Sequence, residues 1–135
     1  MEKTLALIKP DAVKAGFSDA IIGHIEKNDF TILDQKQVRL SKTEVQGFYG
    51  AEHGERPYFE ELVNFMTSGD VIIMVLERDN AITGWRDLMG ATDPAEAAEG
   101  TIRKLFGTSK GNNATHGSDA TESATREIEY FFPSK

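Results

Sequence analysis

The sequence predicts an α+β sandwich, in which helices cover an antiparallel sheet built on a central βαββαβ unit. Apolar runs and segments of helical spacing follow one another along the 135 residues, with no internal repeat. The run at residues 71–76, Val-Ile-Ile-Met-Val-Leu, is unbroken and β-prone, which is typical of a central strand covered on both faces. Hydrophobic residues make up 39% of the chain, enough for one core. We therefore expect a single domain over residues 1–135.

The first part of the chain predicts strand, helix and strand. Residues 4–8 form an apolar run that stops at Lys9-Pro10-Asp11, which indicates a buried strand followed by a polar turn. Ser18 is a helix-capping residue type, and it precedes apolar residues at helical spacing, Ile21, Ile22 and Ile25. Residues 31–40 place Ile32, Val38 and Leu40 among polar residues and predict a half-exposed strand.

Helices dominate the middle of the chain on either side of the 71–76 strand. Ser41-Lys42-Thr43-Glu44 has the pattern of a capping box, so a helix should follow it. A second helical stretch carries its apolar residues at Phe59, Leu62, Val63 and Met66. After the strand, Asp79 or Asn80 can cap a helix that ends near Gly90.

The last third begins with an unusually long connection. Residues 90–112 are rich in Gly, Thr, Ala and Asp, and this length without a strand or helix is typical of a functional loop. A short strand should follow. Residues 119–132 then predict a final amphipathic helix with an inward face formed by Ala124, Ile128, Phe131 and Phe132.

Composition excludes several classes of protein. A net charge of −7 disfavours nonspecific nucleic-acid binding, which requires a basic face. No apolar run reaches the ~20 residues that a membrane span requires. The N-terminus lacks the layout of a signal peptide, so we expect the cytoplasm. The chain has no cysteine, and His24, His53 and His116 do not have metal-ligand spacing. We expect Trp85 to be a packing residue.

The most informative segment for function is Asn113-Ala114-Thr115-His116-Gly117-Ser118-Asp119. A neutral imidazole is a nucleophile near neutral pH, and glycine allows an anion to approach the backbone closely. Ser118 and Asp119 can begin a helix, and a helix N-terminus favours anions. The alternative is a plain turn into the last helix with an incidental histidine, and this segment alone does not decide between the two.

Three turns could build a site for a phosphate chain if the fold brings them together. They are Lys9-Pro10-Asp11, residues 86–94 and residues 113–119, and their convergence would place Lys9, Arg86, Thr92 and Arg103 beside His116. Cations arranged in this way stabilise a phosphoryl group in transfer. The chain has neither a P-loop nor the Gly-rich and His-Arg-Asp motifs of protein kinases. Phosphate chemistry without these devices suggests a phosphohistidine intermediate.

Five motifs in order extend this hypothesis to a known family. They are Ile8-Lys9-Pro10-Asp11, Arg56-Pro57-Tyr58-Phe59, Met89-Gly90-Ala91-Thr92-Asp93-Pro94, Gly100-Thr101-Ile102-Arg103 and the 113–119 segment. Together they cover essentially the whole chain, which resembles the nucleoside diphosphate kinase family. The resemblance implies a ferredoxin-like α+β fold. It also implies transfer of the γ-phosphate of ATP or another nucleoside triphosphate to a nucleoside diphosphate, in a ping-pong scheme through a phosphohistidine.

The resemblance also implies a role for each residue that matches a family motif. His116 would attack through Nδ1, with Glu127 holding the other ring nitrogen and Tyr49 buttressing the pair. The implied nucleotide ligands are Arg86, Thr92 and Arg103 for phosphate oxygens, Lys9 and Asn113 for the sugar hydroxyls, and Tyr58 for stacking on the base. Lys9 would also lie near the transferred phosphate. Mg²⁺ would arrive on the nucleotide phosphates, with Asp119 at most a partner through water.

The chain departs from the family pattern at two places. Tyr58 stands where the family more often has phenylalanine, and its aromatic face still allows stacking. The spacing from Tyr49 to Tyr58 is one residue longer than usual, near Gly50-Ala51, so Tyr49 is either the buttress or a core aromatic.

Two further expectations concern catalysis and assembly. A noncatalytic nucleotide-binding relative would be expected to lose His116, Lys9 or an arginine, and this chain keeps all of them. The half-exposed strand at residues 31–40 has an edge that must be covered or paired, and the family implies a dimer. Because the sequence stops at Phe132-Pro133-Ser134-Lys135, directly after the last predicted helix, we expect a dimer or a tetramer of dimers rather than a hexamer.

Overall fold

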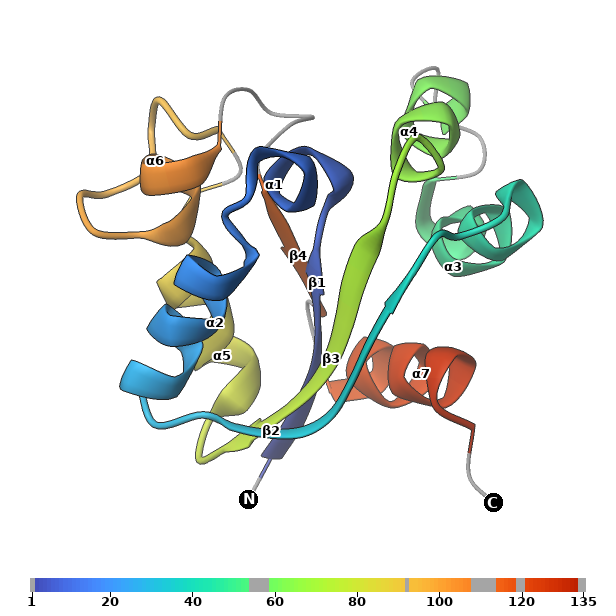
Figure 1. Cartoon of the computed structure of the whole chain (residues 1–135). Helices are drawn as coiled ribbons and strands as arrows, with labels where there is room; N and C mark the ends of the chain where they lie inside the picture. Colours follow the sequence, from blue (N-terminus) through green and yellow to red (C-terminus); the bar gives the residue numbers. More distant parts are fainter. Residues whose placement is uncertain (1, 54–58, 92, 108–113, 119–120, 134–135) are drawn as a thin grey trace.

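The computed structural model describes residues 2–53, 59–91, 93–107, 114–118 and 121–133, with only the helical backbone of residues 49–53. Its centre is a four-stranded sheet of β1 (Glu2–Ile8), β2 (Thr31–Val38), β3 (Val71–Arg78) and β4 (Thr115–Gly117). The strand order is β2-β3-β1-β4, and every neighbouring pair is antiparallel (Figure 1). This arrangement confirms the predicted α+β class.

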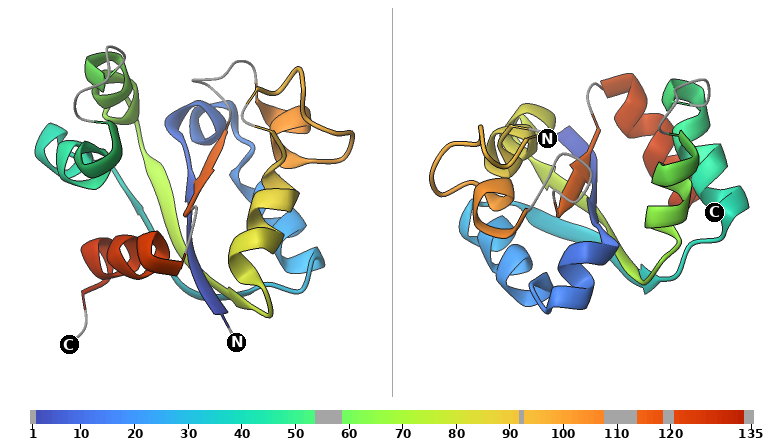
Figure 2. Two further views of the ribbon diagram at one scale, coloured as in Figure 1. Left: turned by 180° about the vertical axis from the view of Figure 1, so that it is seen from behind. Right: turned by 90° about the horizontal axis from the view of Figure 1, so that it is seen from above.

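Helices cover the sheet on both faces, as the two views in Figure 2 show. One layer consists of α1 (Pro10–Ala15), α2 (Ser18–Lys27), α5 (Ala81–Met89) and α6 (Ile102–Phe106). The other consists of α3 (Lys42–His53), α4 (Phe59–Met66) and α7 (Thr121–Phe131). In the described part of the chain, no helix is both long and apolar enough to cross a membrane.

The position of β1 and β3 in the middle of the sheet explains why both strands have long apolar runs. In β1, Leu5 and Leu7 belong to the core cluster under α3, α4 and α7, while Ala6 and Ile8 belong to the cluster under the other layer. The side chains of β3 divide in the same alternating way, with Ile73 among those on the α3 side. Since successive residues of a strand face opposite sides, a sheet covered on both faces needs apolar residues at every position.

The capping box before α3 is present as predicted. The Glu44 N–H donates to Ser41 Oγ over 3.1 Å, and the Ser41 N–H donates to Glu44 Oε1 over 3.0 Å. These reciprocal bonds satisfy two backbone donors that a helix start leaves unpaired.

Two predicted irregular segments contain short helices instead. The expected polar turn after β1 is the start of α1, in which Pro10 occupies the first turn and Gly16 ends the helix at a φ of 84°. Proline suits this position because the first turn does not need its N–H. Within the long 90–112 connection, the Thr101 side chain accepts a bond from the Lys104 N–H and caps α6. A helix of five residues is too short to show a periodic pattern.

Candidate active site

The three turns expected to form a phosphate site converge in the structure. The Lys9 N–H donates to the Ala114 carbonyl over 2.7 Å, which joins the end of β1 to the residue before β4. The Arg103 guanidinium donates to the carbonyls of Gly90 and Thr115, each over 3.0 Å. The loop after α5, the helix α6 and the strand β4 therefore meet the end of β1 at one place.

His116 lies in the middle of β4, where its backbone is opposite Leu7 of β1. Its side chain is 19% exposed, and Nε2 lies 3.9 Å from Oε1 of Glu127 on α7. That distance is longer than a hydrogen bond, and the carboxylate still faces the ring closely enough to raise the pKa of the imidazole. Nε2 is thus the ring nitrogen that faces the Glu127 carboxylate.

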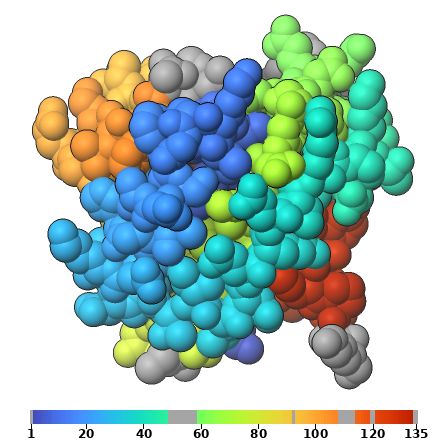
Figure 3. All heavy atoms as spheres, in the orientation of Figure 1, coloured from blue at the N-terminus to red at the C-terminus, as the bar shows by residue number. Residues whose placement is uncertain are grey.

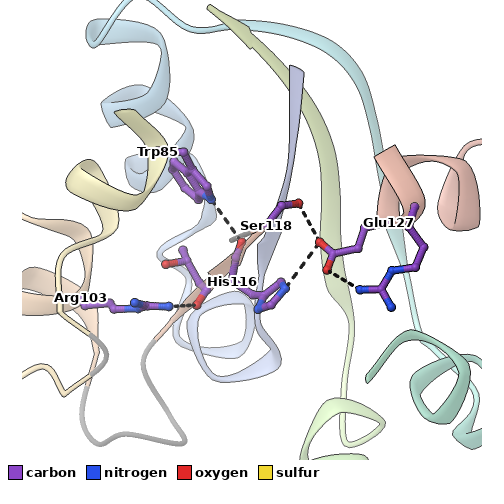
Figure 4. A network of polar contacts seen from close by, with 7 residues as sticks. Trp85, Arg103, His116, Ser118 and Glu127 are labelled. Atoms are coloured by element: carbon purple, nitrogen blue, oxygen red, sulfur yellow. Dashed lines mark hydrogen bonds and ion pairs between the residues drawn. The ribbon is translucent and has the colours of Figure 1, made fainter. Parts of the chain in front are cut away.

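Glu127 is a buried carboxylate with its own support (Figure 4). The Ser118 hydroxyl donates to Glu127 Oε1 over 2.7 Å, and Arg126 Nη2 lies 3.7 Å from Oε2. Sequence reasoning assigned Ser118 only to a helix start and missed this contact. The bond joins the residue directly after β4 to α7 and fixes the carboxylate oxygen that faces His116.

Aromatic side chains support the histidine from two directions. The Phe48 ring stands edge-on to the His116 ring at a centroid distance of 5.4 Å and packs on Phe131 at 4.9 Å. Trp85, fully buried in α5 as a packing residue, donates its Nε1–H to the His116 carbonyl over 3.2 Å. Gly117 permits this contact, because a Cβ there would collide with the indole. No local pattern in the sequence indicates the contact between Phe48 and His116.

Opposing charges act on the His116 ring. Burial lowers the pKa of the imidazole below its ordinary value of 6.5, while the Glu127 carboxylate acts in the opposite direction. The positive charges of Lys9 and Arg103 also lower it. The ring is therefore held neutral near pH 7, which is the protonation state a nucleophile requires.

Lys9 and Arg103 are two buried cations near that ring. Burial and the Arg103 charge lower the pKa of Lys9 from 10.5 to about 8, and the Asp11 carboxylate partly opposes them. Burial also raises the pKa of Asp11, against the effect of Lys9. Two buried cations beside a neutral imidazole suit an incoming polyanion.

The remaining candidate residues are only partly visible. Arg86 is exposed on α5, directly after Trp85. Tyr49 belongs to α3, but its side chain lies outside the described residues, as do Tyr58, Thr92, Asn113 and Asp119. Among the described residues, no group of three or more His, Cys, Asp or Glu side chains is arranged to hold a metal ion.

Comparisons with known proteins point to one family. A family model described as "Nucleoside diphosphate kinase" matches residues 2–135. The nucleoside diphosphate kinase of Syntrophotalea carbinolica is 53% identical over 132 residues, which are 98% of this chain and 96% of that protein. The enzyme of the same name from Desulfotalea psychrophila is also 53% identical, with the same coverage.

Solved structures show the same similarity in three dimensions. The Aquifex aeolicus nucleoside diphosphate kinase superposes with a TM-score of 0.95 at 43% identity, over 97% of this chain and 94% of that one. A nucleoside diphosphate kinase from Halobacterium salinarum, solved in complex with CDP, has a TM-score of 0.94 at 39% identity. That match covers 98% of this chain and 88% of the other.

Proposed function

This chain belongs to the nucleoside diphosphate kinase family, and we propose that His116 is the nucleophile of its reaction. The protein is an enzyme that transfers phosphate between nucleotides through a phosphohistidine intermediate. The observation that carries our assignment is the position of the His116 imidazole, whose Nε2 lies 3.9 Å from the buried Glu127 carboxylate.

The proposed chemistry has two half-reactions of the same kind. The Nδ1 lone pair attacks the γ-phosphorus of a nucleoside triphosphate, and the bond from phosphorus to the bridging oxygen breaks. The nucleoside diphosphate leaves with that bond's electron pair. Glu127 offsets the positive charge that the ring gains through the proton on Nε2. A second nucleoside diphosphate then attacks the phosphohistidine and leaves as a triphosphate.

We assign the remaining nucleotide contacts as the family pattern implies. Lys9 and Arg103 are buried cations whose charges act on the His116 ring, which supports roles beside the transferred phosphate. The other proposed ligands are Arg86 and Thr92 for phosphate, Asn113 with Lys9 for the sugar hydroxyls, and Tyr58 for the base. Tyr49 is proposed to buttress the His116–Glu127 pair.

Mg²⁺ is proposed to enter bound to the nucleotide phosphates. The charges that act on His116 are one carboxylate, Glu127, and two cations, Lys9 and Arg103, a set that suits phosphate oxygens better than a bare cation. The ion would neutralise part of the phosphate charge, and Asp119 would approach it at most through water. The protein's own part is to bind and orient those phosphates.

The substrate range, compartment and assembly complete the proposal. A stacking contact to the base discriminates weakly, because every base has an aromatic face, so the enzyme should accept many bases with ribose or deoxyribose. The CDP complex of the Halobacterium salinarum relative is consistent with that range.

We propose a cytoplasmic enzyme in which residues 1–135 form one domain. We also propose a homo-oligomer, a dimer or tetramer, with no specific nucleic-acid partner.

The test is direct labelling of the protein with γ-labelled ATP. Wild-type protein should acquire label that is stable in base and labile in acid, the behaviour of a phosphohistidine. His116→Ala should acquire none and lose phosphotransfer, while nucleotide binding largely remains. His24→Ala is the matched control, since His24 lies on α2 away from the site, and it should label normally. Substantial turnover in His116→Ala, or intersecting rather than parallel initial-rate lines in wild type, would rule out the covalent mechanism.

A further inference from the structure

Ala114, two residues before His116, has an unusual backbone conformation. Its φ is 75°, in the left-handed region, and its side chain is fully buried. The other described non-glycine residues with positive φ are Asp29 and Asn80, both of types that tolerate this region. Alanine has no polar side chain to compensate, so surrounding contacts must hold it there.

Both backbone polar groups of Ala114 are bound by the segment that follows β1. The Ala114 N–H donates to Asp11 Oδ2 over 3.2 Å, and the Ala114 carbonyl accepts the Lys9 N–H over 2.7 Å. Pro10 lies between Lys9 and Asp11, and its ring fixes its φ. Both bonds to Ala114 therefore come from a stiff segment of backbone. Of the two charged residues in the Lys9-Pro10-Asp11 motif, Asp11 is the one to which the proposed reaction assigns no role.

The position of Ala114 determines how the chain enters β4. That strand has only three residues, and Thr115, His116 and Gly117 pair with Ile8, Leu7 and Ala6. A strand of three residues forms few pairing bonds, so the backbone conformation of the preceding residue strongly affects where the strand lies. If Ala114 relaxed to a negative φ, the chain would enter β4 in a different direction and the position of His116 would change.

We propose that Asp11 is a positioning residue for phosphoryl transfer: its carboxylate holds Ala114 in the left-handed conformation and thereby orients His116. This inference rests on the proposed function. The alternative is that Asp11, an acidic residue in the first turn of α1, serves only to stabilise that helix. The two roles make opposite predictions for variants that combine positions 11 and 114.

The experiment compares Asp11→Ala, Ala114→Gly and the double variant by the rate of His116 labelling from ATP and by thermal unfolding. Asp11→Ala should slow labelling by roughly 10- to 100-fold, the scale of a small misplacement of a reacting group. Glycine adopts positive φ without strain, so Ala114→Gly alone should label normally. The double variant should recover most of the lost rate, because the left-handed conformation no longer depends on the carboxylate.

Two further variants keep the result interpretable. Asp11→Asn retains an acceptor oxygen in a side chain of the same shape, so it should fold even where the alanine variant does not, and it should label faster than a folded Asp11→Ala protein. Asp19→Ala, an exposed acidic residue in the first turn of α2, is the matched control and should label at the wild-type rate. Equal rates in Asp11→Ala and the double variant would overturn the proposal, as would a loss of melting temperature without a change in rate. Absence of label in wild type would instead refute the proposed function itself.

Discussion

At the scale of single residues, the chemistry depends on the balance of charges around His116. Burial, Lys9 and Arg103 lower the pKa of the imidazole, and Glu127 raises it. The neutral ring is the reactive form, so kcat/KM should fall on the acid side as the ring gains a proton. Because the net shift is downward, that acid limb should lie below pH 6.5.

Glu127→Gln tests the sign of this balance. The carboxylate opposes the lowering of the His116 pKa, so its removal should move the acid limb of kcat/KM to still lower pH. The plateau rate should also fall, because an amide does not offset the charge on the ring. The measurement is kcat/KM against pH, with Glu122→Gln on the exposed start of α7 as control. An acid limb displaced to higher pH would contradict the assigned role of Glu127.

The alanine variants of Arg103 and Arg86 should differ in unfolding free energy, although both arginines are proposed phosphate ligands. Each arginine-to-alanine change should lower kcat/KM by roughly 10²–10³-fold, the scale for losing one preorganised donor. Arg103→Ala also removes the bonds to the Gly90 and Thr115 carbonyls, so it should cost about 1.5–3 kcal/mol of unfolding free energy. Arg86 is exposed, and its loss should leave stability nearly unchanged. Urea unfolding of the two variants decides this, and equal losses of stability would argue against an anchoring role for Arg103.

At the scale of elements, the strand that carries His116 is held by packing as much as by pairing. Trp85 of α5 fits against Gly117 and donates to the His116 carbonyl, while Ser118 connects the same strand to α7. The site is therefore built where both helical layers meet the edge of the sheet.

Two glycine substitutions should have opposite effects on stability. Gly117→Ala would press a Cβ into the buried Trp85 indole and near Met89 Cε, so it should cost about 1–3 kcal/mol and reduce activity. Gly23→Ala lies in α2 with nothing within 4 Å of the new Cβ, and should stabilise the helix by about 0.5–1 kcal/mol with activity unchanged. Thermal unfolding with parallel activity assays measures both. A Gly117→Ala protein of normal stability would show that the indole can move aside at little cost.

Local sequence signals predicted some elements well and missed others for a physical reason. The capping box at Ser41 and the apolar run of β3 are complete within a few residues, and both are present. The helix α6 has too few residues for a period to appear. The contacts of Ser118 with Glu127 and of Phe48 with His116 join separate elements, so they depend on the fold and not on any local pattern.

At the scale of the whole molecule, the fold class followed from the order of apolar and helical segments, and the proposed nucleophile from five motifs taken together. The convergence of the turns around His116 was a hypothesis until the strand order β2-β3-β1-β4 brought β4 beside β1. The same strand order leaves β2 at the outer edge of the sheet, and Figure 3 shows its cyan atoms at the surface.

That open edge leads to a prediction about assembly. Strand β2 is largely exposed, and Leu33, at the register shift between Ile32 and Asp34, is 41% exposed. Within the described residues no strand pairs with this edge of β2, so we expect a second copy of the chain to pair with it across a two-fold axis and form an isologous dimer. Leu33→Lys should shift the protein toward monomer in light scattering after size exclusion. Leu105→Lys, at the 50% exposed leucine of α6, is the control and should leave at least a dimer. A monomeric wild type, or dissociation by Leu105→Lys alone, would show that β2 is not the edge that pairs.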